Sequence, residues 1–118
     1  MQKAAIVVLA DTETLESLGR VANAMMTVQE FKEAGDDVKL IFDGAGTKWV
    51  SRLGDPAHQY HDVYERVRDQ VSGVCQYCAD AFGVTEEVRD ADAPFADEYQ
   101  GHPSIRGLVT EGYQVVTF

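Results

Sequence analysis

Apolar runs alternate with stretches of helical periodicity along the chain. Residues 4–10 form a continuous apolar run rich in β-branched side chains, which is typical of a strand buried on both faces of a parallel sheet. Apolar residues then recur between residues 18 and 28 at the spacing of one helix face, and Gly35 ends that helix. Residues 38–42 are typical of a second strand. The pattern predicts a strand–helix–strand unit with parallel strands and a right-handed crossover.

The rest of the chain continues this alternation. We expect a glycine-punctuated loop over residues 43–49 and a helix over residues 58–71. Two short helical stretches follow over residues 79–82 and 84–89. A short strand over residues 93–96, a last helix over residues 103–111 and a last strand over residues 113–118 complete the chain. Because the helical period runs up to Val71, residues 73–74 are interpreted as a break rather than a strand. We therefore predict one α/β domain over residues 1–118, a three-layer α/β/α sandwich with a mainly parallel sheet of four or five strands.

Composition limits the classes of partner. The 118 residues suit a single domain, and 20 Asp and Glu against 10 Lys and Arg give a net charge of -10. This charge disfavours nucleic acid and anionic membranes, because both require clustered basic residues. No apolar run reaches the roughly 18 residues of a membrane span, and residues 4–10 are interpreted as a core strand rather than a secretory signal. We expect a cytoplasmic protein, whose acidity suits either a salt-loaded cytoplasm or an ordinary acidic protein.

The sharpest local feature is Cys75-x-x-Cys78. If Cys75 lies at the start of a helix, unpaired backbone N–H groups and the helix dipole favour its thiolate. Cys78 then lies one turn away, where its thiol can resolve a disulfide or a persulfide. The alternative is that both cysteines are small buried apolar residues without chemistry.

A zinc site is a second alternative for the cysteines. His58-x-x-His61 precedes them, so a Cys2His2 set can be drawn. The long intervening helix differs from zinc-finger spacing, and the core needs no metal, so we predict no bound metal and no cofactor. His102, beside Pro103, is interpreted as a loop or cap residue, with a role in a pocket left open.

A second candidate segment is Asp43-Gly44-x-Gly46, directly after the second strand. Open α/β sheets bind ligands beyond the carboxyl ends of their strands, so these three residues are candidates for a pocket wall beside the cysteines. Neither a dinucleotide fingerprint nor a phosphate loop fits, because the third glycine is missing and Lys48 is wrongly spaced. A tight turn without ligand is the alternative.

The ordered set of features resembles the DsrE/DsrF-like family, particularly its YchN-like branch. The resemblance covers the whole chain: the first strand, the long first helix, the second strand ending in Phe42-Asp43 and the terminal Val115-Val116-Thr117-Phe118. Its most specific part is the run C-x-x-C-x-D-x-x-G followed by an apolar residue, over residues 75–84.

The resemblance implies a parallel-sheet α/β/α sandwich that assembles into homo-oligomers, trimers or hexamers, with the cysteine in a cleft lined by subunits. It also implies sulfur relay, in which a cysteine carries sulfane sulfur as a persulfide between donor and acceptor proteins. By its spacing to Gly83, Cys75 corresponds to the sulfur-carrying cysteine, and Cys78 to a second cysteine present in only some members. Thiol-exchange chemistry is compatible with this role. A non-catalytic assembly module with structural cysteines is the competing hypothesis.

Overall fold

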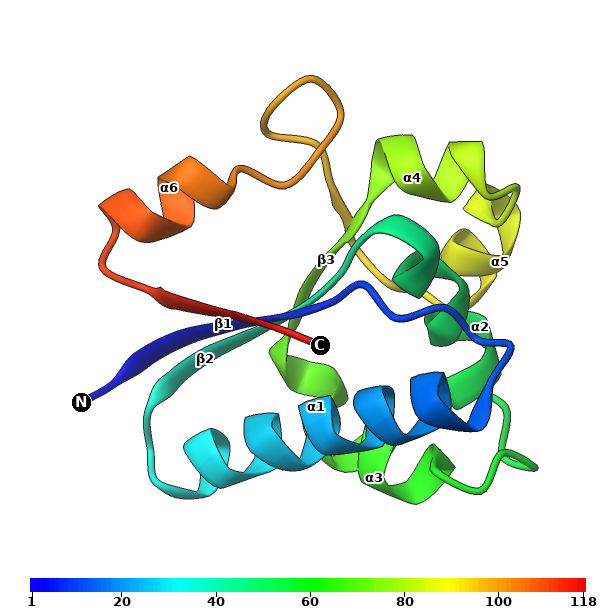
Figure 1. The fold of residues 1–118 in the computed structure, drawn as a ribbon, viewed down its shortest axis with the longest axis horizontal. Coiled ribbons are helices and arrows are strands. Elements are labelled where there is room, and N and C mark those ends of the chain that lie inside the picture. The colour runs from blue at the N-terminus through cyan, green and yellow to red at the C-terminus, as the bar shows by residue number, and fades with distance from the viewer.

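The computed structural model describes all 118 residues and contains one five-stranded sheet (Figure 1). All neighbouring strands pair in parallel, which confirms the predicted sheet type. The spatial order is β4-β3-β2-β1-β5, with bounds β1 (Lys3–Val8), β2 (Asp37–Phe42), β3 (Val71–Cys75), β4 (Phe95–Ala96) and β5 (Gln114–Thr117).

Six α-helices connect these strands. They are α1 (Leu15–Glu33), α2 (Trp49–Leu53), α3 (His61–Val67), α4 (Gln76–Ala81), α5 (Thr85–Asp90) and α6 (Ile105–Thr110). Two 3₁₀ helices, η1 (Gly44–Lys48) and η2 (Arg68–Gln70), complete the chain. The long helix α1 begins where the side chain of Thr14 accepts a hydrogen bond from the backbone N–H of Ser17, as expected of a Thr cap.

The expectation of one helix over residues 58–71 is wrong. The helix α3 ends at Val67, η2 follows, and β3 begins at Val71. Val67 and Val71 keep helical spacing only because each faces the core from a different element. The expected break at residues 73–74 is the middle of β3, so the sheet has five strands.

Chain direction decides how the two faces of the sheet are covered. Each step from β1 to β4 moves outward in the same direction, so right-handed crossovers put α1 to α5 on one face. The chain then returns from β4 to the opposite edge, which puts α6 on the other face. Figure 1 shows α6 above the strands and α1 and α3 below them. The second helical layer is therefore a single short helix.

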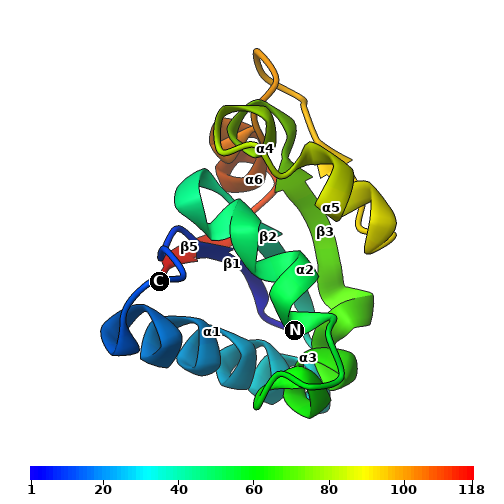
Figure 2. The ribbon, with the colours of Figure 1, turned by 90° about the vertical axis from the view of Figure 1, so that its right-hand side faces the viewer.

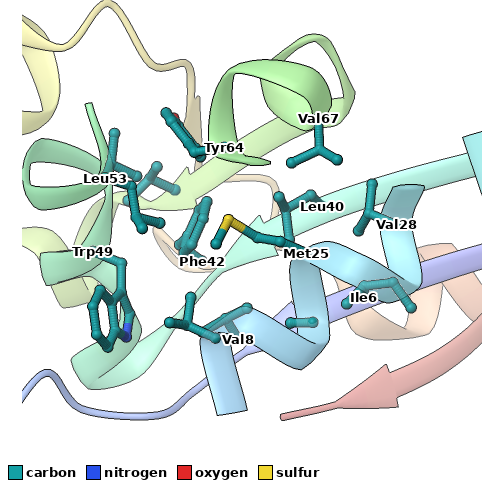
Figure 3. Packing of buried hydrophobic residues seen from close by; sticks show 14 of the residues in the cluster. Ile6, Val8, Met25, Val28, Leu40, Phe42, Trp49, Leu53, Tyr64 and Val67 are labelled. Atoms are coloured by element: carbon teal, nitrogen blue, oxygen red, sulfur yellow. The ribbon is translucent and has the colours of Figure 1, made fainter. Parts of the chain in front are cut away.

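The two faces differ in their buried side chains. Between the sheet and α1 to α5 lies a cluster of 19 buried apolar residues, in which Met25 of α1 and Phe42 of β2 are central (Figure 3). The cluster under α6 has only five members: Ala5, Val7, Ile41, Leu108 and Tyr113. No helix of the structure has the length and apolar composition needed to cross a membrane.

Candidate functional site

Two candidate residues meet at the carboxyl edge of the sheet. Phe42 of β2 pairs with Val74 of β3, so the residues that follow each of them, Asp43 and Cys75, leave the sheet at the same level. The backbone N–H of Asp43 still donates to Val8 O (2.9 Å), which fixes Asp43 against the end of β1. Strand pairing thus brings together two residues that are 32 positions apart in sequence.

Cys75 is the cap residue of α4, as the sequence predicts. Its Sγ accepts a hydrogen bond from the backbone N–H of Cys78 (3.4 Å), and Gln76 begins the helix. Cys75 is completely buried, whereas Cys78, in the first turn of α4, is half-buried. Both cysteines are free thiols.

A histidine from a distant loop completes the surroundings of Cys75. His102 Nδ1 lies 3.3 Å from Cys75 Sγ, and Gly101 O lies 3.8 Å from the same sulfur. Two backbone hydrogen bonds of 2.8 Å between His102 and Tyr99 close this loop, and the rings of His102 and Tyr77 stack with centroids 4.7 Å apart. In Figure 2 the orange loop that follows β4 stands next to α4. The backbone of His102 is therefore fixed within the loop, and its imidazole contacts both the Tyr77 ring and the Cys75 sulfur.

The second thiol faces the carboxylate. Cys78 Sγ lies 3.5 Å from Asp43 Oδ1, which also accepts a hydrogen bond from the backbone N–H of Gly44 (2.8 Å). One donor atom from each of four residues lies within 4.8 Å of all the others. We call this the four-residue cluster: Asp43, Cys75, Cys78 and His102.

The protonation of Cys75 differs from the sequence expectation. The pKa of the Cys75 thiol is raised from an ordinary value of 9.0 to about 12, mainly by burial, with smaller contributions in the same direction from the thiol of Cys78 and the charge of Asp43. The single N–H of Cys78 acts in the opposite direction. Because α4 has only six residues, its terminus does not offset the loss of solvation at Cys75. At neutral pH Cys75 is a thiol, and it needs a base to react.

The glycine segment lies beside the cluster. Gly44 and Gly46 belong to η1, and Asp43 is its cap. Gly44 has a φ of +54°, and Gly46 packs so closely on β1 that a Cβ atom there would lie 2.2 Å from Val8 O. Asp43 thus reaches the cysteines, while Gly44 and Gly46 shape the turn that carries it.

The histidines of the zinc alternative lie outside the cluster. The ring of His58 lies edge-on to that of Trp49 on α2, and His61 Nδ1 lies 2.8 Å from Leu53 O. The Cys2His2 set of His58, His61 and the two cysteines is therefore not formed. From the sequence, His102 is interpreted as a loop or cap residue, with a role in a pocket left open. No local motif marks it, because its contact with Cys75 depends on the path of the loop after β4.

Comparison with known proteins finds relatives that cover most or all of the chain. The model of the DsrE/DsrF-like family matches residues 2–118. The chain belongs to this family. An uncharacterized protein of Methanocaldococcus jannaschii is 30% identical over 94 residues, which span 80% of this chain and 76% of the relative.

Two solved structures share the fold of this DsrE/DsrF-like protein. The ychN protein from E. coli matches with a TM-score of 0.61 and 19% identity over the full length of both chains. A conserved protein of unknown function from Bacteroides thetaiotaomicron matches with a TM-score of 0.61 and 18% identity, over 97% of this chain and 94% of the other. The predicted family and α/β fold are confirmed. Because the two solved structures are less than 20% identical to this chain, they support the fold alone.

Proposed function

We propose that this DsrE/DsrF-like protein relays sulfur, with Cys75 accepting sulfane sulfur as a persulfide. The observation that carries the proposal is the position of Cys75 Sγ, 3.3 Å from the His102 imidazole and one helical turn from a second free thiol. A nucleophile and a base within reach are the parts that sulfur uptake requires, and a neighbouring thiol can resolve the persulfide.

The uptake step balances without a redox partner. The Cys75 thiol gives its proton to His102 Nδ1, and its sulfur attacks the outer sulfur of a donor persulfide, R–S–SH. The S–S bond of the donor breaks, a new S–S bond forms on Cys75, and the departing R–S⁻ takes up the proton from His102. The net reaction converts Cys75–SH and R–S–SH into Cys75–S–SH and R–SH.

Cys78 decides the fate of the persulfide in this scheme. An acceptor thiolate that attacks the outer sulfur takes it away and regenerates the Cys75 thiol. If Cys78 attacks the inner sulfur instead, hydrogen sulfide leaves and a Cys75–Cys78 disulfide forms. The second route removes the carrier from use until the disulfide is reduced, so Cys78 acts as a resolving thiol.

Access to Cys75 sets a condition on the donor. Cys75 is fully buried, whereas the other three members of the four-residue cluster are half-buried. We therefore expect a sulfur donor to approach Cys75 past Cys78 and Asp43. For a bulky donor, the loop that carries His102 has to move. Gly44 and Gly46, which form the turn beside Asp43, are proposed as part of the wall of this entrance.

Sulfur uptake is measured directly by intact mass. The reduced protein is incubated with thiosulfate or polysulfide in the absence of metal, and we expect the gain of one sulfur atom per chain. Cys75→Ser is expected to lose the adduct, while Cys78→Ser, the matched control, keeps it and retains it longer. No adduct on the native protein, or an undiminished adduct on Cys75→Ser, contradicts the proposal.

A second candidate function is a non-catalytic assembly module whose cysteines are structural. The complete burial of Cys75 and the raised pKa of its thiol favour this candidate. It predicts that neither thiol of the native protein takes up sulfur or reacts with an alkylating reagent at neutral pH. A thiol titration in native buffer separates the two functions.

We also propose that the protein is a homo-oligomer, a trimer or a hexamer. Parallel sheets are normally covered on both faces, yet α6 is the only helix on its side, and its Ile105 and Val109 are at least 40% exposed. A second copy of the chain would cover this surface.

The proposed sulfur relay requires two further partners, a sulfur donor protein and a sulfur acceptor protein. We propose that it takes place in the cytoplasm, where reducing conditions keep thiols such as Cys75 and Cys78 free.

A further inference from the structure

In contrast to the expectation from sequence of no bound metal, we propose that the four-residue cluster binds one Zn²⁺ ion per chain in tetrahedral coordination. Two thiols, one imidazole and one carboxylate converge from three separate segments of the chain: the end of β2, the β3–α4 junction and the loop after β4. This is a different use of the cluster from sulfur relay, and it does not depend on sulfur uptake.

The spacing of the donor atoms suits a small tetrahedral ion. Zinc bonds of about 2.0–2.3 Å place neighbouring donor atoms about 3.3–3.8 Å apart on a tetrahedron. Cys75 Sγ lies 3.3 Å from His102 Nδ1, and Cys78 Sγ lies 3.5 Å from Asp43 Oδ1. No two of the four donor atoms are more than 4.8 Å apart, so rotations of the side chains close the remaining gap.

The chemical nature of the donors selects the ion. Magnesium and calcium prefer oxygen ligands. A tetrahedral set that includes two sulfur atoms and an imidazole nitrogen favours zinc among the common divalent ions. Binding is not a redox step: Zn²⁺ and two thiols give a zinc dithiolate and two protons. The ion replaces the thiol protons of Cys75 and Cys78, so the two thiolates match its charge and the negative charge of the Asp43 carboxylate is kept.

The supports of the ligands are already in place. The N–H of Gly44 holds the carboxylate of Asp43, and the N–H of Cys78 points to Cys75 Sγ. His102 is held by its backbone bonds to Tyr99 and by the ring of Tyr77. Such outer contacts orient ligands before the metal arrives. Three of the four ligands are half-buried, which leaves a route for the ion from solvent.

Cobalt(II) provides a spectroscopic test on the full chain without a histidine tag. The reduced protein is titrated with Co²⁺, and we expect one ion per chain, thiolate-to-cobalt charge-transfer absorption and the intense visible bands of tetrahedral cobalt, all removed by one equivalent of Zn²⁺. Cys78→Ser should lose about half of the charge-transfer intensity and bind at least about a hundredfold more weakly. Asp43→Asn, which keeps both thiols, should weaken binding while the charge-transfer band remains at saturation.

His58→Gln is the matched control, because it removes a histidine outside the cluster, and it should titrate like the native protein. Weak octahedral bands without charge transfer, stoichiometry other than one per chain, or a titration altered by His58→Gln but not by Cys78→Ser overturns the zinc site. Because sulfur uptake is measured by mass in metal-free buffer, a failed cobalt titration does not affect the sulfur-relay proposal. A failed sulfur uptake likewise does not affect the zinc-site proposal.

Discussion

His102 Nδ1 lies 3.3 Å from Cys75 Sγ across 27 positions of sequence. The pKa of the buried Cys75 thiol is raised to about 12, so only a small fraction is thiolate at neutral pH. An adjacent imidazole can take the thiol proton as the sulfur attacks, which removes the need for a preformed thiolate. We therefore expect the reactivity of Cys75 at neutral pH to depend on His102.

Replacement of His102 should slow sulfur uptake in a pH-dependent way. We expect His102→Gln to lower the rate at neutral pH by about 10²-fold, the usual contribution of a positioned base. The deficit should shrink as pH rises toward the pKa of Cys75, because hydroxide then supplies the thiolate. Rates are measured by intact mass over a pH series, with His58→Gln as the control. A deficit that stays constant across the pH series contradicts the role of His102 as a base.

Alkaline pH should weaken the fold through Tyr113. Tyr113 Oη donates a hydrogen bond to Asp37 Oδ2 (2.7 Å), and this bond raises the pKa of the Tyr113 phenol from 10.0 to about 12. The unfolded chain ionises first, so the stabilisation is complete below pH 10 and is lost as pH rises from 10 to about 12. We expect Tyr113→Phe to cost about 1 kcal/mol at neutral pH and to lose less stability than the native protein over this window.

Urea unfolding at a series of pH values measures this difference. Tyr99→Phe is the matched control, because the Tyr99 side chain is 65% exposed and lies outside the Tyr113–Asp37 contact. Its free energy of unfolding should follow that of the native protein. Identical slopes for Tyr113→Phe and the native protein between pH 10 and 12 would show that the hydrogen bond does not set the alkaline limit.

Two glycines should respond in opposite directions to alanine. A Cβ atom on Gly46 would lie 2.2 Å from Val8 O, the same oxygen that accepts the N–H of Asp43, so Gly46→Ala must displace backbone. We expect a loss of at least about 2 kcal/mol in the free energy of unfolding, as for overpacked core sites. At Gly19, inside α1, an added Cβ would meet no atom within 4 Å other than those of its chain neighbours and the adjoining helix backbone, so Gly19→Ala should stabilise by about 0.5–1 kcal/mol. Equal effects of both variants in chemical denaturation would contradict this account.

The order of elements was predictable because most of them carry strong local patterns. The run over residues 4–10 and the helical stripe from Leu18 to Val28 match β1 and α1. The strand β3 was missed because it is five residues long and Gly73 interrupts its apolar pattern. That glycine is needed because a Cβ there would lie 2.5 Å from Ala96 Cβ on β4. Its reason is a tertiary contact, which local periodicity does not contain.

The candidate site was predictable only where strand ends or helix starts define it. Cys75 at the start of α4 and Asp43 after β2 follow from the position of their elements. Burial of Cys75 follows instead from the loop that closes over it. The same loop brings in His102, and it lies after a strand of only two residues. Neither the raised pKa nor the four-residue cluster is therefore visible in local spacing.

The exposed face of α6 should control self-association. Ile105 and Val109 lie one turn apart on α6 with exposed fractions of 40% and 60%, beside Leu108, which is buried against the sheet. We expect the native protein to sediment as a trimer or hexamer at micromolar concentration and Val109→Lys to dissociate it, because a charge would be buried without a partner. Leu15→Lys, on α1 and 85% exposed, is the matched control and should leave the assembly intact. A native protein that sediments as a monomer, or equal dissociation by both variants, would mean that α6 does not form the interface between copies.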